Sequence, residues 1–226
     1  MRCWLYVDGF NLYHGAVKPC GKKWVDLLRL GQQLRKADTI ERIKYFTALV
    51  ENRTDDPGQQ RRQRLYWRAL GTLPGLQRIE GQFTSHPRPL PLYDSVELLR
   101  TLARRGCDVT GIRPTMMKML RSEEKGTDVN LAVHLVNDAH QEDAQKTFEL
   151  AVVVSADSDL CEAIRIVTHE VGKPVFVYTP NDRCHTAALR AVATNVFSIT
   201  QAKIRASQFP MEMQDARGRF VKPVGW

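Results

Sequence analysis

The chain has 226 residues, 43% of them hydrophobic, and a formal net charge of +8 at pH 7. This length accommodates one sizeable α/β domain, and the hydrophobic content argues against an intrinsically disordered chain. The basic balance favours a polyanionic partner, with nucleic acid first and an acidic membrane surface second. A basic protein without such a partner is the open alternative.

Strand-like apolar runs alternate with helix-like periodic segments along the chain. The predicted strands are 3–7, 43–50, 76–83, 150–154, 173–178 and 195–200, with a short extended piece at 107–112. The predicted helices are 24–36, 61–70, 95–105, 125–140 and 160–167; the fourth is amphipathic through Val129, Ala132, Val133 and Val136. This alternation predicts an α/β fold in which a mostly parallel sheet is covered by helices on both faces.

Two segments interrupt the alternation. His86–Pro91 contains three prolines and is predicted to be a loop, because proline suits neither a helix interior nor a central strand. Residues 201–226 are polar and contain several prolines and glycines. We therefore expect a domain over residues 1–200, followed by a C-terminal extension over residues 201–226.

The cysteines and the N-terminus favour a cytoplasmic protein. Five cysteines, an odd number, occur without a CxxC pair, which argues against a disulfide scaffold or a cysteine zinc site. The chain begins MRCWLYVDG, without the charged and apolar regions of a signal peptide. No apolar run approaches the roughly 20 residues that a membrane-spanning helix needs, so we expect no membrane attachment.

Carboxylates follow two predicted strands and open one predicted helix. Asp8 follows the first strand, Asp157 and Asp159 follow the strand at 150–154, and Asp128 lies at the start of the fourth helix. In an open parallel sheet, ligands bind outside the carboxyl ends of the strands. If the first strand and the strand at 150–154 are central neighbours, all four carboxylates converge on one crevice.

Converging carboxylates repel one another unless a cation neutralises them. Mg²⁺ and Mn²⁺ prefer oxygen ligands, so we expect one of these ions as the cofactor, held by Asp8, Asp128, Asp157 and Asp159. Such an ion activates water and clamps a phosphodiester. The alternative is that these Asp and Ser residues only cap helices, which for any single motif is the simpler interpretation.

Two groups of basic residues suit contacts with phosphate. The first comprises Arg53, Arg61, Arg62, Arg64 and Arg68, with Tyr66 and Trp67 interleaved; the second comprises Arg100, Arg104, Arg105, Arg113, Lys118, Arg121 and Lys125. Long cationic side chains reach phosphates, and aromatic rings stack on unpaired bases. We expect Lys125, Arg61, Arg62 and Arg64 to bind substrate. The alternative is a solvated helix face with buried aromatic residues.

Three stretches carry a family resemblance. They are Tyr6–Tyr13 (YVDGFNLY), Lys125–Ala132 (KGTDVNLA) and Val153–Leu160 (VVSADSDL). In order, spacing and context they resemble the NYN domain family, which belongs to the PIN-like nuclease superfamily and includes the bacterial LabA-like proteins. The resemblance spans roughly residues 1 to 200. It implies a three-layer α/β/α PIN-like fold and a Mg²⁺- or Mn²⁺-dependent ribonuclease site.

The resemblance also implies roles for individual residues. Asp8 is the implied acidic ligand after the first strand, Asp128 the carboxylate at the helix start, and Asp157 and Asp159 the carboxylates at the strand end. Asn11 is implied to orient Asp8 or a bound water.

Ser155 is the implied hydroxyl beside the strand-end carboxylates, and we expect it to bind substrate together with the four basic residues. Many LabA-like proteins carry a further Asp where this chain has His134. His134 lies six residues after Asp128, about 120° around the helix, so the two do not share a face.

The sequence as a whole favours a metal-dependent endoribonuclease that acts on single-stranded or structured RNA. Two alternatives stay open. One is an RNA- or nucleotide-binding regulatory module with little or no catalysis, and the other is a phosphatase acting on a small phosphorylated substrate. A homo-oligomer is compatible with the sequence. The basic residues do not distinguish RNA from DNA, because phosphate contacts carry no such information.

Overall fold

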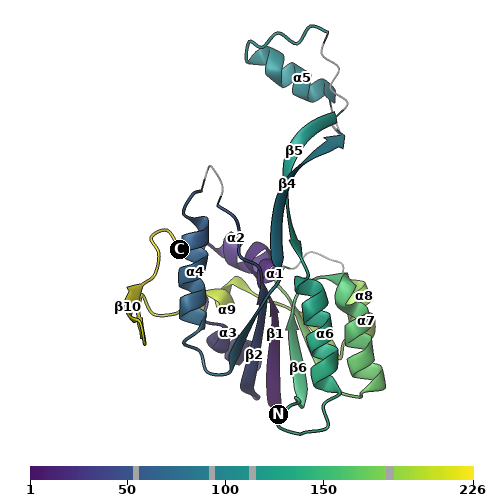
Figure 1. Ribbon diagram of the computed structural model, residues 1–226. Coiled ribbons are helices and arrows are strands. Elements are labelled where there is room, and N and C mark those ends of the chain that lie inside the picture. The colour runs from purple at the N-terminus through teal and green to yellow at the C-terminus, as the bar shows by residue number, and fades with distance from the viewer. Residues whose placement is uncertain (53–55, 92–94, 112–115, 182–185) are drawn as a thin grey trace. The chain divides into compact units, whose positions relative to one another are not determined.

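A six-stranded parallel sheet forms the centre of the protein (Figure 1). The computed structural model describes residues 1–52, 56–91, 95–111, 116–181 and 186–226. The strands of the sheet are β1 (Arg2–Asp8), β2 (Thr39–Thr47), β3 (Leu76–Glu80), β6 (Leu150–Val154), β7 (Val175–Thr179) and β8 (Asn195–Ser198). Their order is β3-β2-β1-β6-β7-β8, and every neighbouring pair is parallel. The predicted parallel sheet is confirmed.

Helices cover both faces of this sheet (Figure 1). One face carries α3 (Leu27–Leu34), α4 (Gln59–Leu70) and α9 (Gln201–Ala206), and the other carries α6 (Thr127–Ala139), α7 (Cys161–Arg165) and α8 (Thr186–Val192). Along β1, Leu5 and Val7 join the first hydrophobic cluster, whereas Trp4 and Tyr6 join the second. Successive side chains of a strand point to opposite faces, so the predicted three-layer α/β/α fold is confirmed.

Short helical segments follow the two central strands. After β1 come α1 (Gly9–Leu12), a π-helical turn (Tyr13–Val17) and α2 (Lys18–Cys20); after β6, a 3₁₀ turn (Ser158–Leu160) and a π-helical turn (Ile166–Glu170) flank α7. Both central strands are almost entirely buried, as strands covered on both faces are.

The direction in which successive strands are added to the sheet reverses between β1 and β6. From β1 it proceeds outward to β2 and β3, and from β6 it proceeds the other way to β7 and β8. The carboxylates were expected to converge if β1 and β6 were neighbours in the sheet. The two strands are paired, with Val7 opposite Val154. This register brings the next residues, Asp8 and Ser155, side by side at the carboxyl-terminal edge of the sheet, where such folds bind ligands.

A separate compact unit, here called the arm, comprises residues Phe83–Glu124. It is built from the two-stranded sheet of β4 (Gln82–Pro91) and β5 (Met116–Lys125) together with α5 (Ser95–Arg104). Residues Met1–Gln82 and Lys125–Trp226 form the other unit, here called the main unit. The predicted strand at 76–83 is thus two strands, β3 and the start of β4, with Gly81 between them.

The predicted loop at His86–Pro91 is wrong, because these residues belong to β4. The prolines stand at every second position, 87, 89 and 91. Alternate residues of a strand direct their backbone groups toward the same edge, so all three missing N–H groups lie on one edge. A two-stranded sheet leaves one edge of each strand unpaired, and proline is tolerated there.

Two further sequence predictions differ from the structure. No strand forms over 107–111, the described part of the predicted extended piece; instead Asp108 Oδ1 accepts a hydrogen bond of 2.9 Å from the backbone N–H of Thr110, as in a turn. In α6 the predicted apolar stripe is not the buried one. Val129 and Val133 are 65% and 60% exposed, whereas Leu131 and Leu135 are buried.

The last residues are part of the main unit. Residues 201–226 contain α9 and the antiparallel pair β9 (Glu212–Asp215) and β10 (Gly218–Val221). Ile204, Phe209 and Phe220 join the same hydrophobic cluster as Trp24. The boundary at residue 200 stays a prediction. Within the described residues, no helix is both long enough and apolar enough to cross a membrane.

Candidate active site

Asp8 ends β1 and is 3% exposed. Its Oδ1 accepts a hydrogen bond of 2.9 Å from the backbone N–H of Asn11, which makes Asp8 the N-cap of α1. Its Oδ2 accepts a hydrogen bond of 3.0 Å from Ser155 Oγ. The capping interpretation therefore holds for Asp8, but capping engages only one of its two oxygens.

Burial raises the pKa of Asp8 to about 6. The negative charges of Asp128 and Asp157 raise the pKa further, whereas the hydrogen bonds from Asn11 and Ser155 lower it. Burial and neighbouring like charges both disfavour an ionised carboxylate. Asp8 is thus a carboxyl group whose environment shifts its titration toward neutral pH.

Asn11 joins the turns that follow the two central strands. Its backbone N–H donates to Asp8, and its side-chain Oδ1 accepts a hydrogen bond of 3.1 Å from the backbone N–H of Ala156. The resemblance implied that Asn11 orients Asp8 or a bound water. Its contact with Asp8 is made by the backbone N–H, so the implied role of the side chain stays a prediction. The bond to Ala156 was not predicted, because no sequence pattern indicates a side-chain contact to a distant backbone amide.

Ser155 and Asp157 form the turn after β6. Ser155 is 1% exposed; its Oγ donates to Asp8 and accepts a hydrogen bond of 3.1 Å from the backbone N–H of Asp157. Asp157 Oδ1 accepts a hydrogen bond of 3.0 Å from the backbone N–H of Asp159 and caps the 3₁₀ turn. A continuous chain of hydrogen bonds thus runs from Asp8 to Asp159.

Asp128 lies in the first turn of α6, where the positive end of the helix dipole favours an anion. Asp128 is exposed, yet partial desolvation of its carboxylate raises its pKa, and the charges of Asp157 and Asp159 raise it further. The four carboxylates predicted from the sequence therefore come from three separate segments and interact electrostatically. Asp8 and Asp128 interact with Asp157, and Asp128 also interacts with Asp159.

The carboxylates fit the donor chemistry of Mg²⁺ and Mn²⁺, which prefer oxygen ligands. Among the described residues, however, no three His, Cys, Asp or Glu side chains form a ready-made metal-binding group. The two observations are compatible, because charges interact over longer distances than metal–ligand bonds span. A Mg²⁺ ion usually keeps several of its waters, so carboxylates at such a spacing suit a partly hydrated ion.

The predicted substrate-binding residues lie on two elements. Arg61, Arg62 and Arg64 lie in the first half of α4, which connects β2 to β3 and therefore begins near the carboxyl-terminal edge of the sheet (Figure 1). Arg61 and Arg64 are exposed, whereas Arg62 forms an ion pair with Asp56. Lys125 is exposed and ends β5, three residues before Asp128.

The aromatic residues of α4 belong to the core. Trp67 is 7% exposed and lies under the guanidinium group of Arg78. Tyr66 packs against the same hydrophobic cluster and donates a hydrogen bond of 2.9 Å to the backbone carbonyl of Val25. The structure thus agrees with the alternative interpretation, in which these aromatic residues are buried. The two rings therefore do not stack on bases.

His134 belongs to a buried polar cluster. Its Nδ1 lies 3.1 Å from Lys44 Nζ, and burial together with the Lys44 charge lowers its pKa. Lys44 Nζ also donates to Asp138 Oδ2 at 2.5 Å, and Tyr6 OH donates to the same oxygen at 2.7 Å. This cluster holds the second half of α6 on β1 and β2. Sequence patterns did not predict this cluster, although a lysine within the apolar run of β2 was a signal.

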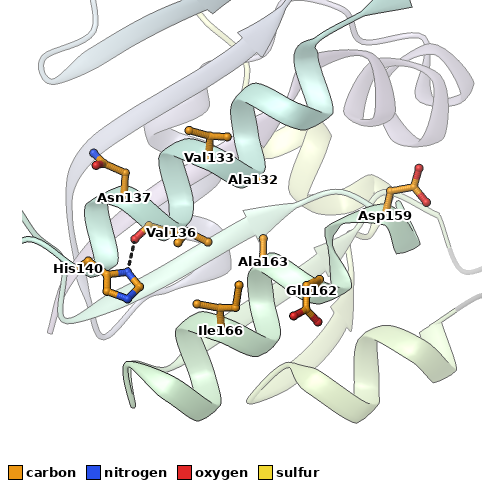
Figure 2. Close-up of a pocket in the computed structure, with 9 residues that line it drawn as sticks. All are labelled: Ala132, Val133, Val136, Asn137, His140, Asp159, Glu162, Ala163 and Ile166. Atoms are coloured by element: carbon orange, nitrogen blue, oxygen red, sulfur yellow. Dashed lines mark hydrogen bonds between the residues drawn. The ribbon is translucent and has the colours of Figure 1, made fainter.

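A groove of about 610 Å³ runs between α6 and α7 (Figure 2). It is lined by Ala132, Val133, Val136, Asn137, His140, Asp159, Glu162, Ala163 and Ile166. Asp159 lies at one end of the groove, and the other three candidate carboxylates do not line it. The groove therefore does not coincide with the candidate site.

Comparisons with known proteins leave the activity open. No family model matches the chain. The chain is 25% identical over 249 residues to 6-hydroxy-3-succinoylpyridine 3-monooxygenase of Pseudomonas putida, an alignment that covers 100% of this chain and 75% of that protein. A crystal structure of a protein of unknown function from Vibrio parahaemolyticus matches with a TM-score of 0.47 and 15% identity, covering 88% of this chain and 93% of that chain.

Proposed function

We propose that this protein is a Mg²⁺- or Mn²⁺-dependent endoribonuclease of the NYN type that hydrolyses phosphodiester bonds of RNA in the cytoplasm. Asp8 carries the proposal. It is a buried carboxylate whose pKa of about 6 is raised by burial and by the charges of Asp128 and Asp157. An ionised carboxylate in this environment lowers the stability of the folded chain. Carboxylates with strongly perturbed pKa values cluster at functional sites.

Asp8, Asp128, Asp157 and Asp159 would hold the ion, which when bound would neutralise the carboxylates and polarise water and the phosphate for hydrolysis. Asn11 and Ser155 hold the Asp8 carboxylate in one orientation through the hydrogen bonds at 2.9 and 3.0 Å.

Exposed cations near the same edge of the sheet favour a polyanionic substrate. Arg61 and Arg64 are exposed on the first half of α4, and Lys125 is exposed at the end of β5. Arginine binds phosphate oxygens in a planar, two-pronged geometry. Arg62 has a structural role as well, because it pairs with Asp56. The net charge of +8 supports the same class of substrate.

The test is cleavage of a labelled single-stranded RNA by the purified protein in Mn²⁺, in Mg²⁺ and in EDTA. We expect cleavage only with metal, and we expect Asp157→Asn to slow it by about 100-fold. Asp143→Asn is the matched control. Asp143 is an exposed carboxylate paired with Lys146 at 3.3 Å, so its neutralisation should leave the rate unchanged.

The other outcomes decide between the alternatives. Equal degradation by wild type and Asp157→Asn would mean that a contaminant cleaves the RNA. Binding of RNA without turnover in any metal would favour the regulatory binding module. Hydrolysis of a small phosphoester but not of RNA would favour the phosphatase.

A second candidate function is monooxygenation of a hydroxylated pyridine. The alignment with 6-hydroxy-3-succinoylpyridine 3-monooxygenase covers the whole chain, and this favours it. The test is to incubate the protein with 6-hydroxy-3-succinoylpyridine, oxygen and a nicotinamide reductant, and to measure oxygen consumption and the mass of the product. An oxygenated product, together with intact RNA in the cleavage assay, would replace the nuclease proposal.

A further inference from the structure

We propose that the arm, residues Phe83–Glu124, is an RNA-binding element that grips the phosphate backbone of a single strand through Arg88, Arg104, Arg105 and Lys118. The inference deepens the proposed function and rests on it for the choice of RNA as the polyanion. It assigns binding to a unit that carries none of the four candidate carboxylates.

The arm has no hydrophobic core among its described side chains. None of them is buried, and Val96 of α5 and Met119 of β5 are 56% and 48% exposed. Buried apolar area is the main source of folding stability, so this unit adds little stability to the protein. Long insertions of this kind in a compact fold usually carry function.

The cations of the arm are exposed and mostly unneutralised. Arg88, Arg104, Arg105 and Lys118 are exposed, and no carboxylate of the described residues pairs with them. Arg100 pairs with Glu97 at 3.8 Å, with both side chains more than half exposed, an interaction worth little in water.

Many arginines of the main unit are paired instead. Examples are Arg2 with Glu149, Arg35 with Asp38, Arg68 with Asp215 and Arg165 with Glu162. A group of unpaired cations on an exposed unit retains its full attraction for an anion. The neutralisation of phosphates by such residues supplies most of the free energy of sequence-independent binding to nucleic acid.

The unpaired edge of β4 argues against the addition of a protein strand at that edge. Pro87, Pro89 and Pro91 place three missing N–H groups on one edge of β4. An added strand needs a continuous row of backbone donors and acceptors, which prolines interrupt. Side chains, rather than backbone, are therefore what this part of the arm offers to a ligand, and the exposed ones include Arg88.

The arm is joined directly to the segment that carries Asp128. Strand β5 ends at Lys125, Gly126 follows with a φ of 87°, and Asp128 is the second residue of α6. A strand of RNA bound to the arm is thereby tethered to the unit that holds the carboxylates. Tethering raises the local concentration of substrate without any new contact at the reacting bond.

The experiment measures RNA binding by fluorescence anisotropy in EDTA, so that no metal-dependent turnover occurs. The probe is a labelled single-stranded RNA, and salt is varied from about 50 to 200 mM. We expect Arg104→Gln/Arg105→Gln to weaken binding roughly tenfold at the lower salt concentrations. We also expect it to reduce the slope of log affinity against log salt by about 1.4, since each phosphate contact to a single strand contributes about 0.7.

The matched control is Arg29→Gln/Arg165→Gln, which removes the same net charge from the main unit. Arg29 pairs with Asp26 at 3.4 Å and Arg165 pairs with Glu162 at 2.6 Å. We expect its affinity and salt slope to match those of the wild type. Equal effects in both double variants, or no effect in either, would overturn the proposal. So would binding of the wild type to vesicles of acidic phospholipid but not to RNA.

Two measurements separate this inference from the proposed nuclease activity and from a structural role. Arg104 and Arg105 lie at the C-terminal end of α5, where cations also stabilise a helix; a purely structural role would lower the melting temperature without changing the salt slope, which would overturn the proposal. Metal-dependent cleavage of the same RNA tests the carboxylate site. Its absence in the wild type would contradict the nuclease, whereas the anisotropy measured in EDTA tests the binding arm on its own.

Discussion

Ser155 and Asp8 are 147 positions apart in the chain, yet Ser155 Oγ donates a hydrogen bond of 3.0 Å to Asp8 Oδ2. The parallel pairing of β1 with β6 produces this contact, because Asp8 and Ser155 each follow the last paired residues, Val7 and Val154. The donated bond lowers the pKa of Asp8 and so opposes the effect of burial. The serine therefore supports the ionised form of the carboxylate.

Ser155→Ala should destabilise the protein by about 1–3 kcal/mol at pH 8, because it removes a buried hydrogen bond to a charged group. The loss should be smaller at pH 5, where Asp8 is mostly protonated. Urea unfolding at the two pH values measures both free energies. Ser158→Ala, at an exposed position of the adjacent 3₁₀ turn, is the control. A loss of equal size at both pH values would contradict the charge-dependent role.

Asp8→Asn should increase stability at alkaline pH in the absence of divalent metal. Burial raises the folded-state pKa of Asp8 to about 6, whereas in the unfolded chain this carboxyl has a pKa of about 4. The wild type therefore loses stability as pH rises from about 4 to about 6, and the loss is complete above that range. The variant lacks this loss. We expect a gain of up to about 3 kcal/mol at pH 8 and little difference at pH 4. Equal stability of the two proteins at pH 8 would show that burial does not strain this carboxylate.

Lys44 and Asp138 form a buried ion pair with side chains that are each 8% exposed. Removal of one partner leaves an uncompensated charge, so Lys44→Met should reduce the free energy of unfolding by about 3–5 kcal/mol. The double variant Lys44→Met/Asp138→Leu should recover much of that loss, although Tyr6 then lacks its acceptor. Chemical denaturation of the two single variants and the double variant measures the coupling. Additive losses would mean that the pair contributes no interaction energy.

Gly81→Ala should disturb the entry of α6. A Cβ at Gly81 would lie 2.6 Å from Thr127 Oγ1 and 2.7 Å from the carbonyl oxygen of Lys125. Relief of this clash moves the residues that precede Asp128, so we expect metal-dependent cleavage to fall at least tenfold while the protein remains folded. Gly71→Ala, where the nearest atoms are at 3.4 Å, is the control. Unchanged cleavage in Gly81→Ala would show that the position of Asp128 does not depend on this contact.

The sequence predicted the parallel sheet and the carboxyl-terminal edge on which the carboxylates meet, because both follow from the alternation of elements. It did not predict which stripe of α6 is buried. Apolar residues of α6 lie at 129, 131, 132, 133, 135, 136 and 139, and at about 100° per residue they cover an arc of roughly 200°. Helical spacing alone does not say which part of so wide an arc is buried, and packing against β1 and β2 decides in favour of Leu131 and Leu135.

The arm was also beyond the reach of sequence patterns. Prolines normally indicate a loop, and they are compatible with β4 only because a two-stranded sheet leaves an edge without partners. The hydrogen bond between Asn11 and Ala156 likewise arises from the pairing of β1 with β6, which local patterns do not encode.

The position of the arm along the chain divides the candidate site into two halves. Asp8 and Asn11 precede the arm, whereas Asp128, Ser155 and Asp157 follow it. A chain cut within the arm would yield two fragments, each with a share of the sheet, and neither would contain the complete set of carboxylates. Only reassociation of the fragments along the β1–β6 pairing would restore that set. The protein is therefore organised as two complementary fragments, and the arm that connects them contributes no strand to the central sheet.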